Sequence, residues 1–362
     1  MGVSRLKVTA PGRICLFGEH QDYLSLPVIT AAINLRLTIE GEQRTDRIFH
    51  IKLPDIQQTD QFEITSDIGY IKKRDYLRSA VNILTRNGVQ FPGGYNCIVR
   101  SEIPINSGSG SSSALVVAWI KFLLTIAEDH RANNPFQIAN LAHQAEVLEF
   151  GEPGGKMDHF ASSLGKIQYI DFENVTKFHQ LSAELGTFVL GDSLESKDTE
   201  SILKRVKGGV STAIDKLSAK QDIALRYFEI SKLREFNGIL NDEQIELLTA
   251  TFLNRDLTQK AYYQFMDAKM SPRNLGKLLT ESHTILRDKL KISTPKIDNM
   301  ISSAIVAGAT GGKINGSGGG GCMFVNTPQH PDKIAKAITR AGGKPYIVTI
   351  DSGARTEYIL KG

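Results

Sequence analysis

A segment rich in glycine and serine, Gly108 to Ser113 (GSGSSS), constrains the fold of this chain more than any other feature. It lies between residues 95–101, which have the pattern of a strand, and residues 111–126, which begin with serines able to cap a helix and continue as an apolar helix. Glycines let successive backbone N–H groups converge, and a helix N-terminus attracts anions. A flexible linker would not join a strand to a helix in this way, so the segment predicts a phosphate-binding loop. The Walker pattern GxxxxGK[ST] is absent from the sequence.

A second glycine-rich segment, Gly316 to Gly321, follows a strand expected at residues 313–315. It contains the pattern GxGxxG, which in dinucleotide-binding proteins joins a strand to a helix. Here a strand at residues 322–325 follows instead, and the segment lies near the C-terminus. A dinucleotide site is therefore not expected, and the pattern predicts a tight turn where a backbone approaches another backbone or a ligand closely.

A polar cluster follows the first expected strand, residues 6–10, which we expect to end at Pro11-Gly12. Glu19, His20 and Asp22 lie within four residues of one another on one short loop. Carboxylates that each accept two hydroxyl protons suit a ligand with many hydroxyl groups. Two alternatives remain for this segment by itself: a solvated charged loop, or a metal site, for which a third spaced His or Cys is lacking.

An aspartate, Asp158, follows a Pro-Gly-Gly turn and enters an apolar stretch of helical pattern. Taken by itself, an aspartate near a helix N-terminus is most often a cap. A chemical role for Asp158 therefore needs support from outside this segment.

The chain has 362 residues, a length that suits two domains in close contact. An α+β half is followed near residue 180 by a mostly helical stretch and then by another α+β half, so we expect domains at residues 1–180 and 181–362. The net charge is +4, with no basic block of the kind that nucleic-acid binders carry. Three dispersed cysteines indicate neither disulfides nor zinc. Without a signal-peptide pattern or a stretch long enough to span a membrane, a cytoplasmic protein is expected.

In this order and spacing, the segments resemble the signature motifs of the GHMP kinases, a superfamily that includes galactokinase, homoserine kinase, mevalonate kinase and phosphomevalonate kinase. Three segments of this chain resemble the three family motifs in order. They are APGRICLFGEHQDY (10–23), PINSGSGSSSALVVA (104–118) and KINGSGGGGCMFV (313–325). Two flanking blocks, residues 145–172 and 275–300, are similar to galactokinase in particular. The likeness covers nearly the whole chain.

The resemblance implies an α+β fold of two domains. The N-terminal domain would be like the second domain of ribosomal protein S5, and the C-terminal domain would be ferredoxin-like with a helical insertion. ATP is then expected between them, with its phosphates over the loop formed by Gly108, Ser109, Gly110, Ser111, Ser112 and Ser113.

The resemblance also implies roles for single residues by their position in the motifs. Ser112 and Glu146 match the ligands of Mg²⁺. Asp158 matches the catalytic acid–base residue, which accepts the proton or orients the hydroxyl, and Arg13 matches the basic residue beside the reacting hydroxyl. The positions that match sugar contacts are Glu19, His20, Asp22 and the backbone of Gly155.

Several residues depart from the family pattern. The stretch after Tyr23 lacks the usual glycine, and His159 stands where galactokinases commonly carry Gln. Ser109 and Asn315 replace the usual Leu and Thr. Residues 191–202 lack the tyrosine that contacts sugar in typical galactokinases. These departures leave the identity of the sugar open.

We therefore expect an ATP-dependent sugar kinase that phosphorylates the anomeric hydroxyl of galactose or a related sugar, as a monomer or homodimer without nucleic-acid or membrane partners. Mevalonate kinase is the alternative enzyme. The opening motif and Gly110 favour it, whereas residues 21–23 and Met157-Asp158 do not. A third alternative is a non-enzymatic sugar sensor derived from galactokinase, which would be expected to have lost the phosphate loop or the acid; both are present.

Overall fold

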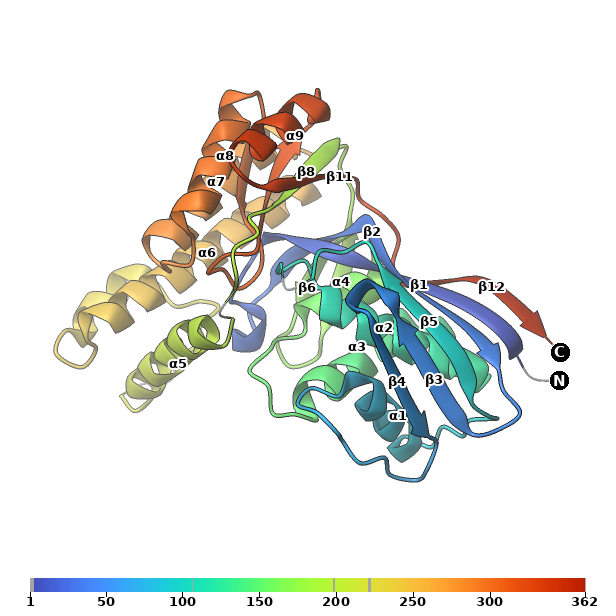
Figure 1. Ribbon diagram of the computed structural model, residues 1–362. Helices are drawn as coiled ribbons and strands as arrows, with labels where there is room; N and C mark the ends of the chain where they lie inside the picture. The colour runs from blue at the N-terminus through green and yellow to red at the C-terminus, as the bar shows by residue number, and fades with distance from the viewer. Residues whose placement is uncertain (1–2, 106, 198, 221–222, 362) are drawn as a thin grey trace.

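The computed structural model describes residues 3–105, 107–197, 199–220 and 223–361. Asn106, in the second motif, lies outside the described residues. Two sheets with helices packed on them make up the molecule (Figure 1).

The first sheet has eight strands: β1 (Val3–Phe17), β2 (Val28–Gln43), β3 (Ile48–Leu53), β4 (Gln58–Glu63), β5 (Tyr95–Ser101), β6 (Ile167–Asp171), β7 (Lys177–Leu181) and β12 (Arg355–Lys361). Their order is β12-β1-β2-β5-β3-β4, with β6 paired to β2 and β7 paired to β6. The pairing of β3 with β5 is parallel, and the others are antiparallel. The first and last strands of the chain therefore lie side by side (Figure 1).

The helices of this half are α1 (Tyr76–Arg86), α2 (Ser111–Ile126), α3 (Pro135–His143) and α4 (Met157–Leu164), with a π-helical turn at Gln144–Leu148 and short 3-10 helices at Asp22–Leu24, Pro54–Ile56 and His130–Asn133. They pack on one face of the sheet (Figure 1). Fully buried aromatic rings fill the space between, with the centroids of Phe49 and Trp119 5.1 Å apart.

The second sheet has four strands: β8 (Thr187–Asp192), β9 (Gly311–Ile314), β10 (Cys322–Thr327) and β11 (Lys344–Val348). Its order is β11-β8-β10-β9 and all its pairings are antiparallel. Helices α5 (Thr199–Ser218), α6 (Asp242–Met266), α7 (Pro272–Asp288) and α8 (Pro295–Val306), with a 3-10 helix at Ile230–Phe236, lie between β8 and β9 in the chain, and α9 (Pro331–Arg340) lies between β10 and β11. This order is that of a ferredoxin-like sheet with extra helices, so the expected α+β fold is confirmed.

One hydrophobic cluster joins the two sheets. It contains Ile14 and Phe17 of β1 together with Leu190 of β8 and Phe324 of β10, all of them fully buried. Because interiors are close-packed, a shared core holds the two sheets in a defined relation. The two sheets therefore keep a fixed position relative to each other.

The first strand is longer than the sequence predicts. It continues through Pro11-Gly12 to Phe17, because the β1–β2 register shifts between Pro11 and Arg13 and so accommodates the proline at a bulge. The backbone N–H of Arg13 donates to the carbonyl of Ser109 at 3.0 Å. The irregularity thus directs the strand toward the glycine-rich loop.

The chain crosses from the first sheet to the second between Leu181 and Thr187 and returns to the first sheet with β12. The domain boundary that we expect near residue 180 stays a prediction. Among the described residues, no helix is both long and apolar enough to cross a membrane.

Candidate active site

A cavity of about 730 Å³ brings the three motifs together. It lies where the first motif loop, the glycine-rich loop, the start of α4 and the third motif meet. Of the residues predicted for the site, those that line it are Arg13, Glu19, His20, Asp22, Gly108, Gly110, Ser111, Ser112, Ser113, Glu146, Gly155 and Asp158.

Ser109 is the predicted site residue that is not among those lining the cavity. It is fully buried, and its carbonyl accepts the N–H of Arg13. Its hydroxyl lies 3.3 Å from that of Ser107. Ser109 therefore holds the loop against β1.

The glycine-rich loop ends at the N-terminus of α2, with Gly110 in the N-cap position. Gly108 and Gly110 have φ angles of 80° and 75°, the left-handed region that favours glycine. The carbonyl of Gly108 accepts hydrogen bonds from Nη1 of Arg13 and from Nδ2 of Asn315, the latter at 3.0 Å. These two donors hold the carbonyl of Gly108. The loop then leads into the start of α2, where the first N–H groups of a helix have no partner within the helix and can bind an anion.

Asp158 forms a bidentate ion pair with Arg13. Nε and Nη2 of Arg13 lie 2.8 and 2.7 Å from Oδ1 and Oδ2 of Asp158. The Arg13 side chain is buried, whereas that of Asp158 is 28% exposed and reaches the cavity. Burial alone would lower the pKa of Arg13, but the charge and hydrogen bonds of Asp158 outweigh it, and the pKa is raised.

The pattern of Asp158 indicated a helix cap, and this interpretation is wrong. The N-cap position of α4 belongs to Lys156, and Asp158 lies in the first turn. Its carboxylate oxygens are held by Arg13, 145 residues away in the chain.

Glu146 is on the π-helical turn that continues α3. Its Oε2 lies 2.7 Å from Nε2 of His159, and both side chains are almost fully buried. The ring of His143 meets that of His159 edge-on at 5.4 Å, and burial followed by the neighbouring His159 lowers the pKa of His143 to about 3. The extra residue of a π turn redirects side chains, and such turns are frequent at functional sites.

Glu146 and Ser112 line the same cavity, but the described residues contain no group of three His, Cys, Asp or Glu side chains that could hold a metal. Mg²⁺ usually takes one or two protein ligands and completes its shell with phosphate and water. One carboxylate oxygen and one serine hydroxyl fit that pattern, so the residues present are compatible with Mg²⁺ held together with a phosphate group.

Asp22 links the first motif to α4. Its carboxylate accepts the backbone N–H groups of Met157 and Tyr23, each at 3.0 Å. Burial raises the pKa of Asp22, and these two N–H donors oppose the rise. A Cβ on Gly155 would lie 1.8 Å from Oδ2 of Asp22, so the close approach requires glycine there.

His20 joins the first motif to the third. Its Nε2 lies 3.0 Å from the carbonyl of Ser317 and its Nδ1 lies 2.8 Å from the hydroxyl of Tyr23. Since a carbonyl only accepts, Nε2 carries the hydrogen and Nδ1 accepts from Tyr23. Burial lowers the pKa of His20 to about 4, which agrees with a neutral ring.

Glu19 forms a buried ion pair with Lys313, whose Nζ also donates to the carbonyls of Cys15 and Ile314 at 3.0 Å. The other carboxylate oxygen, Oε2, is buried without a hydrogen-bond partner among the described residues. Both ring nitrogens of His20 and one oxygen of Glu19 are thus occupied within the protein, and a role for either in contacting sugar stays a prediction.

The sequence patterns did not identify the apolar end of the cavity. Ile56 and Ile105 line this end and are 43% and 54% exposed. These side chains come from separate strands and loops, and no local pattern joins them. Among the apolar residues that line the cavity are Leu37, Leu53, Ile56, Val99, Ile105 and Leu115.

Lys197 was also missed, since a single lysine in a polar stretch carries no motif. It lies between β8 and α5 and lines the cavity. A Cβ on Gly108 would be 2.7 Å from its Nζ, which places the ammonium group against the glycine-rich loop.

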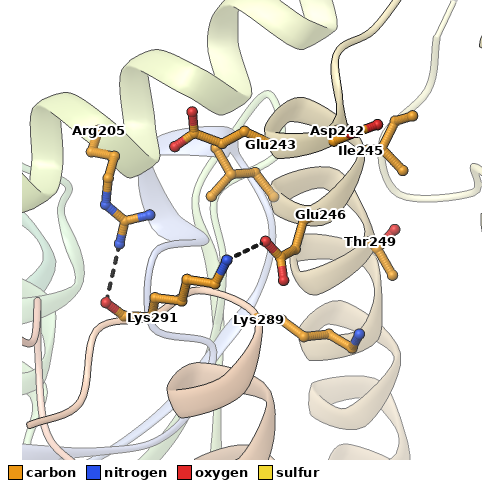
Figure 2. A pocket seen from close by; sticks show the side chains of 9 residues that line it. Arg205, Asp242, Glu243, Ile245, Glu246, Thr249, Lys289 and Lys291 are labelled. Atoms are coloured by element: carbon orange, nitrogen blue, oxygen red, sulfur yellow. Dashed lines mark hydrogen bonds and ion pairs between the residues drawn. The ribbon is translucent and has the colours of Figure 1, made fainter.

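A second cavity, of about 660 Å³, lies between α5, α6 and the segment after α7 (Figure 2). Nζ of Lys291 is 2.6 Å from Oε2 of Glu246, and Nη2 of Arg205 donates to the carbonyl of Lys291 (Figure 2). Nη2 of Arg205 also donates to the carbonyl of Leu290. None of the three motifs lines it. Two of its cations, Arg205 and Lys291, are paired with acceptors of the protein itself. The first cavity, which the motifs line, is therefore the candidate active site.

Three family models match the chain. The model of the GHMP kinases N-terminal domain matches residues 75–166, and that of the GHMP kinases C-terminal domain matches residues 266–344. The model of the galactokinase galactose-binding signature matches residues 2–42.

Relatives of two kinds are similar over almost the full length. The mevalonate kinase of Thermococcus gammatolerans is 30% identical over 98% of this chain and 99% of its own. The galactokinase of Pasteurella multocida is 27% identical over 92% of this chain and 88% of its own. The crystal structure of Lactococcus lactis galactokinase complexed with galactose has the same fold, with a TM-score of 0.85 and 20% identity over 97% of this chain and 95% of that one.

The fold and the matching models define a phosphotransferase that acts on an alcohol group. More particularly, the chain belongs to the GHMP kinase family.

Proposed function

We propose that the protein transfers the terminal phosphoryl group of ATP to the anomeric hydroxyl of galactose or a related sugar. The observation that carries the phosphoryl-transfer part is the Arg13–Asp158 pair, which presents a carboxylate to the cavity beside the glycine-rich loop. Phosphoryl transfer depends above all on positioning and on neutralised charge, and this arrangement supplies both.

The match of residues 2–42 to the galactose-binding signature supports a sugar as the acceptor. So does the chemistry of the cavity, which the carboxylates of Asp22 and Asp158 both line. Carboxylates accept hydroxyl protons, which a polyhydroxylated acceptor has in excess.

The cavity has room for ATP along the glycine-rich loop. The adenine ring would lie against the apolar end, where Ile56 and Ile105 are exposed, and the phosphates would lie over the start of α2. Ser112 and Glu146 would hold Mg²⁺, which when bound neutralises phosphate charge. His159 would keep the Glu146 carboxylate in place.

Within this site, Arg13 fixes the direction of the Asp158 carboxylate through two hydrogen bonds. Asp158 would then orient the acceptor hydroxyl or accept its proton. The backbone of Gly155 lies close to the carboxylate of Asp22, and both would contact the acceptor.

Phosphorylation of mevalonate is a second candidate. The relative of 30% identity is named a mevalonate kinase, and Lys197 gives the cavity a further cation that an acceptor carboxylate would suit.

An ATP-consumption screen across hexoses, pentoses, heptoses and mevalonate separates the two candidates, with the position of the new phosphate determined by NMR. The proposal expects turnover with an aldose and a sugar 1-phosphate as product. Turnover with mevalonate and none with the sugars would establish the second candidate instead.

A further inference from the structure

Lys197 has no role in the motifs, yet it lines the candidate site and its ammonium group lies against the glycine-rich loop. A Cβ on Gly108 would be 2.7 Å from Nζ of Lys197, and a Cβ on Gly110 would be 3.7 Å from Oδ2 of Asp158. The same Cβ on Gly110 would be 3.2 Å from Cγ of Arg13. Within the loop, Gly108 therefore adjoins Lys197, and Gly110 adjoins the Arg13–Asp158 pair.

Lys197 has no hydrogen bond or ion pair with any residue that the structure describes. Burial, followed by the charge of Arg13, lowers its pKa to about 8, while Asp158 and Cys322 oppose the shift. Both oxygens of Asp158 are already bonded to Arg13. The described residues thus surround this ammonium group with too little negative charge, an arrangement typical of a group that meets an anionic ligand.

We propose that Lys197 binds an oxygen of the phosphoryl group that is transferred from ATP. This inference rests on the proposed function, because it takes the glycine-rich loop as the ATP phosphate site. Lys197 beside Gly108 and Arg13 beside Gly110 then both approach the transferred group. The Asp158 carboxylate, whose oxygens can each accept more than one hydrogen bond, contacts the acceptor hydroxyl. Two cations at this place neutralise the charge that spreads over the phosphoryl oxygens during transfer.

An acceptor carboxylate has the same anionic chemistry and is the other source that Lys197 would suit. The terminal phosphoryl group is favoured, because Nζ of Lys197 lies against Gly108 of the phosphate loop. The residues that match acceptor contacts, Asp22 and Gly155, instead lie close to each other, and Asp22 accepts the N–H of Met157. The two sources predict different measurements, since ADP lacks the terminal phosphoryl group and the acceptor is absent from a nucleotide-binding experiment.

The test compares the dissociation constants of ATP and ADP, measured with Mg²⁺ at pH 7 by calorimetry, for the wild-type protein and Lys197→Met. Methionine has a similar length and no charge. A charge-assisted hydrogen bond is worth roughly a 10- to 100-fold change in affinity, so the variant is expected to lose about that factor for ATP. Its affinity for ADP should stay close to that of the wild type.

Lys204→Met is the matched control, since Lys204 is an exposed lysine of the same segment, seven residues further on. It should bind both nucleotides as the wild type does. Lys197→Arg keeps the charge and should retain most of the preference for ATP over ADP. Thermal unfolding checks that the variants are folded; removing a charge that has no hydrogen-bond or ion-pair partner among the described residues should not destabilise the protein. Were Lys197→Met still to unfold, Lys197→Gln would take its place.

An equal loss for ATP and ADP would overturn the inference, because Lys197 would then act on the loop or on the inner phosphates. Unchanged ATP affinity with a raised KM for the acceptor would overturn it as well, in favour of an acceptor anion. Wild-type protein that binds neither nucleotide would overturn the proposed function itself, a result distinct from both.

Discussion

Nε2 of His159 lies 2.7 Å from Oε2 of Glu146, and this almost fully buried pair lines the cavity where the three motifs meet. A buried carboxylate with one oxygen fixed by a neighbour presents its other oxygen in a defined direction. In this chain, the histidine that departs from the family's usual Gln is therefore the residue that orients Glu146.

The first prediction concerns this pair. His159→Gln keeps an N–H donor within reach of Glu146 and should retain activity and Mg²⁺ requirement close to the wild type. His159→Leu removes the donor, so the concentration of Mg²⁺ for half-maximal activity should rise about 10- to 100-fold, the usual cost of losing such a partner. Activity titrated with Mg²⁺ provides the measurement. Equal behaviour of the Leu and Gln variants would show that His159 only fills space.

Asp158→Asn tests the acid–base role. Asn still offers an acceptor to Arg13 but lacks the charge, so the melting temperature should fall only modestly while turnover falls by roughly 10²–10⁴. Asp129→Asn is the matched control, since Asp129 forms a similar bidentate pair with Arg131 away from the cavity. That variant should keep full turnover. If Asp158→Asn retained more than about a tenth of wild-type turnover, positioning by Arg13 would suffice without the acid.

Gly155→Ala should displace Asp22, because the new methyl group would lie 1.8 Å from its carboxylate oxygen. We expect the KM for the acceptor to rise about tenfold or more, the effect of one disturbed polar contact, with a smaller change in the KM for ATP. Steady-state kinetics with each substrate varied in turn gives both constants. Gly69→Ala, where a Cβ would meet nothing within 4 Å, serves as the control and should change neither. Equal increases in both KM values would argue against an acceptor role for Asp22.

The buried neutral ring of His20 predicts a loss of stability in acid. Its pKa is about 4 in the folded protein, against an ordinary value of 6.5 for histidine, so between these values the unfolded chain binds the proton and the folded protein does not. Stability therefore falls as pH is lowered from about 6.5 to 4, by up to about 3 kcal/mol from this group. Urea unfolding at a series of pH values measures the slope. His20→Gln should be less stable at pH 7 but should lose less stability between pH 6.5 and 4; an unchanged slope would assign the effect to other groups.

Local patterns carried much of the fold. The glycine-rich segment between strand and helix, and the strands on each side of Gly316 to Gly321, were predicted correctly because turn, cap and alternation signals act within a few residues. The end of β1 was wrong, because a bulge paired to β2 lets the strand continue past Pro11-Gly12. The pairing with β2 accommodates Pro11, and the residues near Pro11 in the sequence do not reveal this partner strand.

The sequence by itself determined the family, the α+β class and the segments that meet at the site, because these depend on the order of short motifs and on periodicity. Only the tertiary structure decided what the side chains do there. It paired Asp158 with Arg13, 145 residues distant, where the local pattern indicated a helix cap. It also brought Lys197 against Gly108 from a stretch without any motif. The physical reason is that charge and hydrogen bonding act over a few ångströms in space, and close packing brings together residues that the chain keeps far apart.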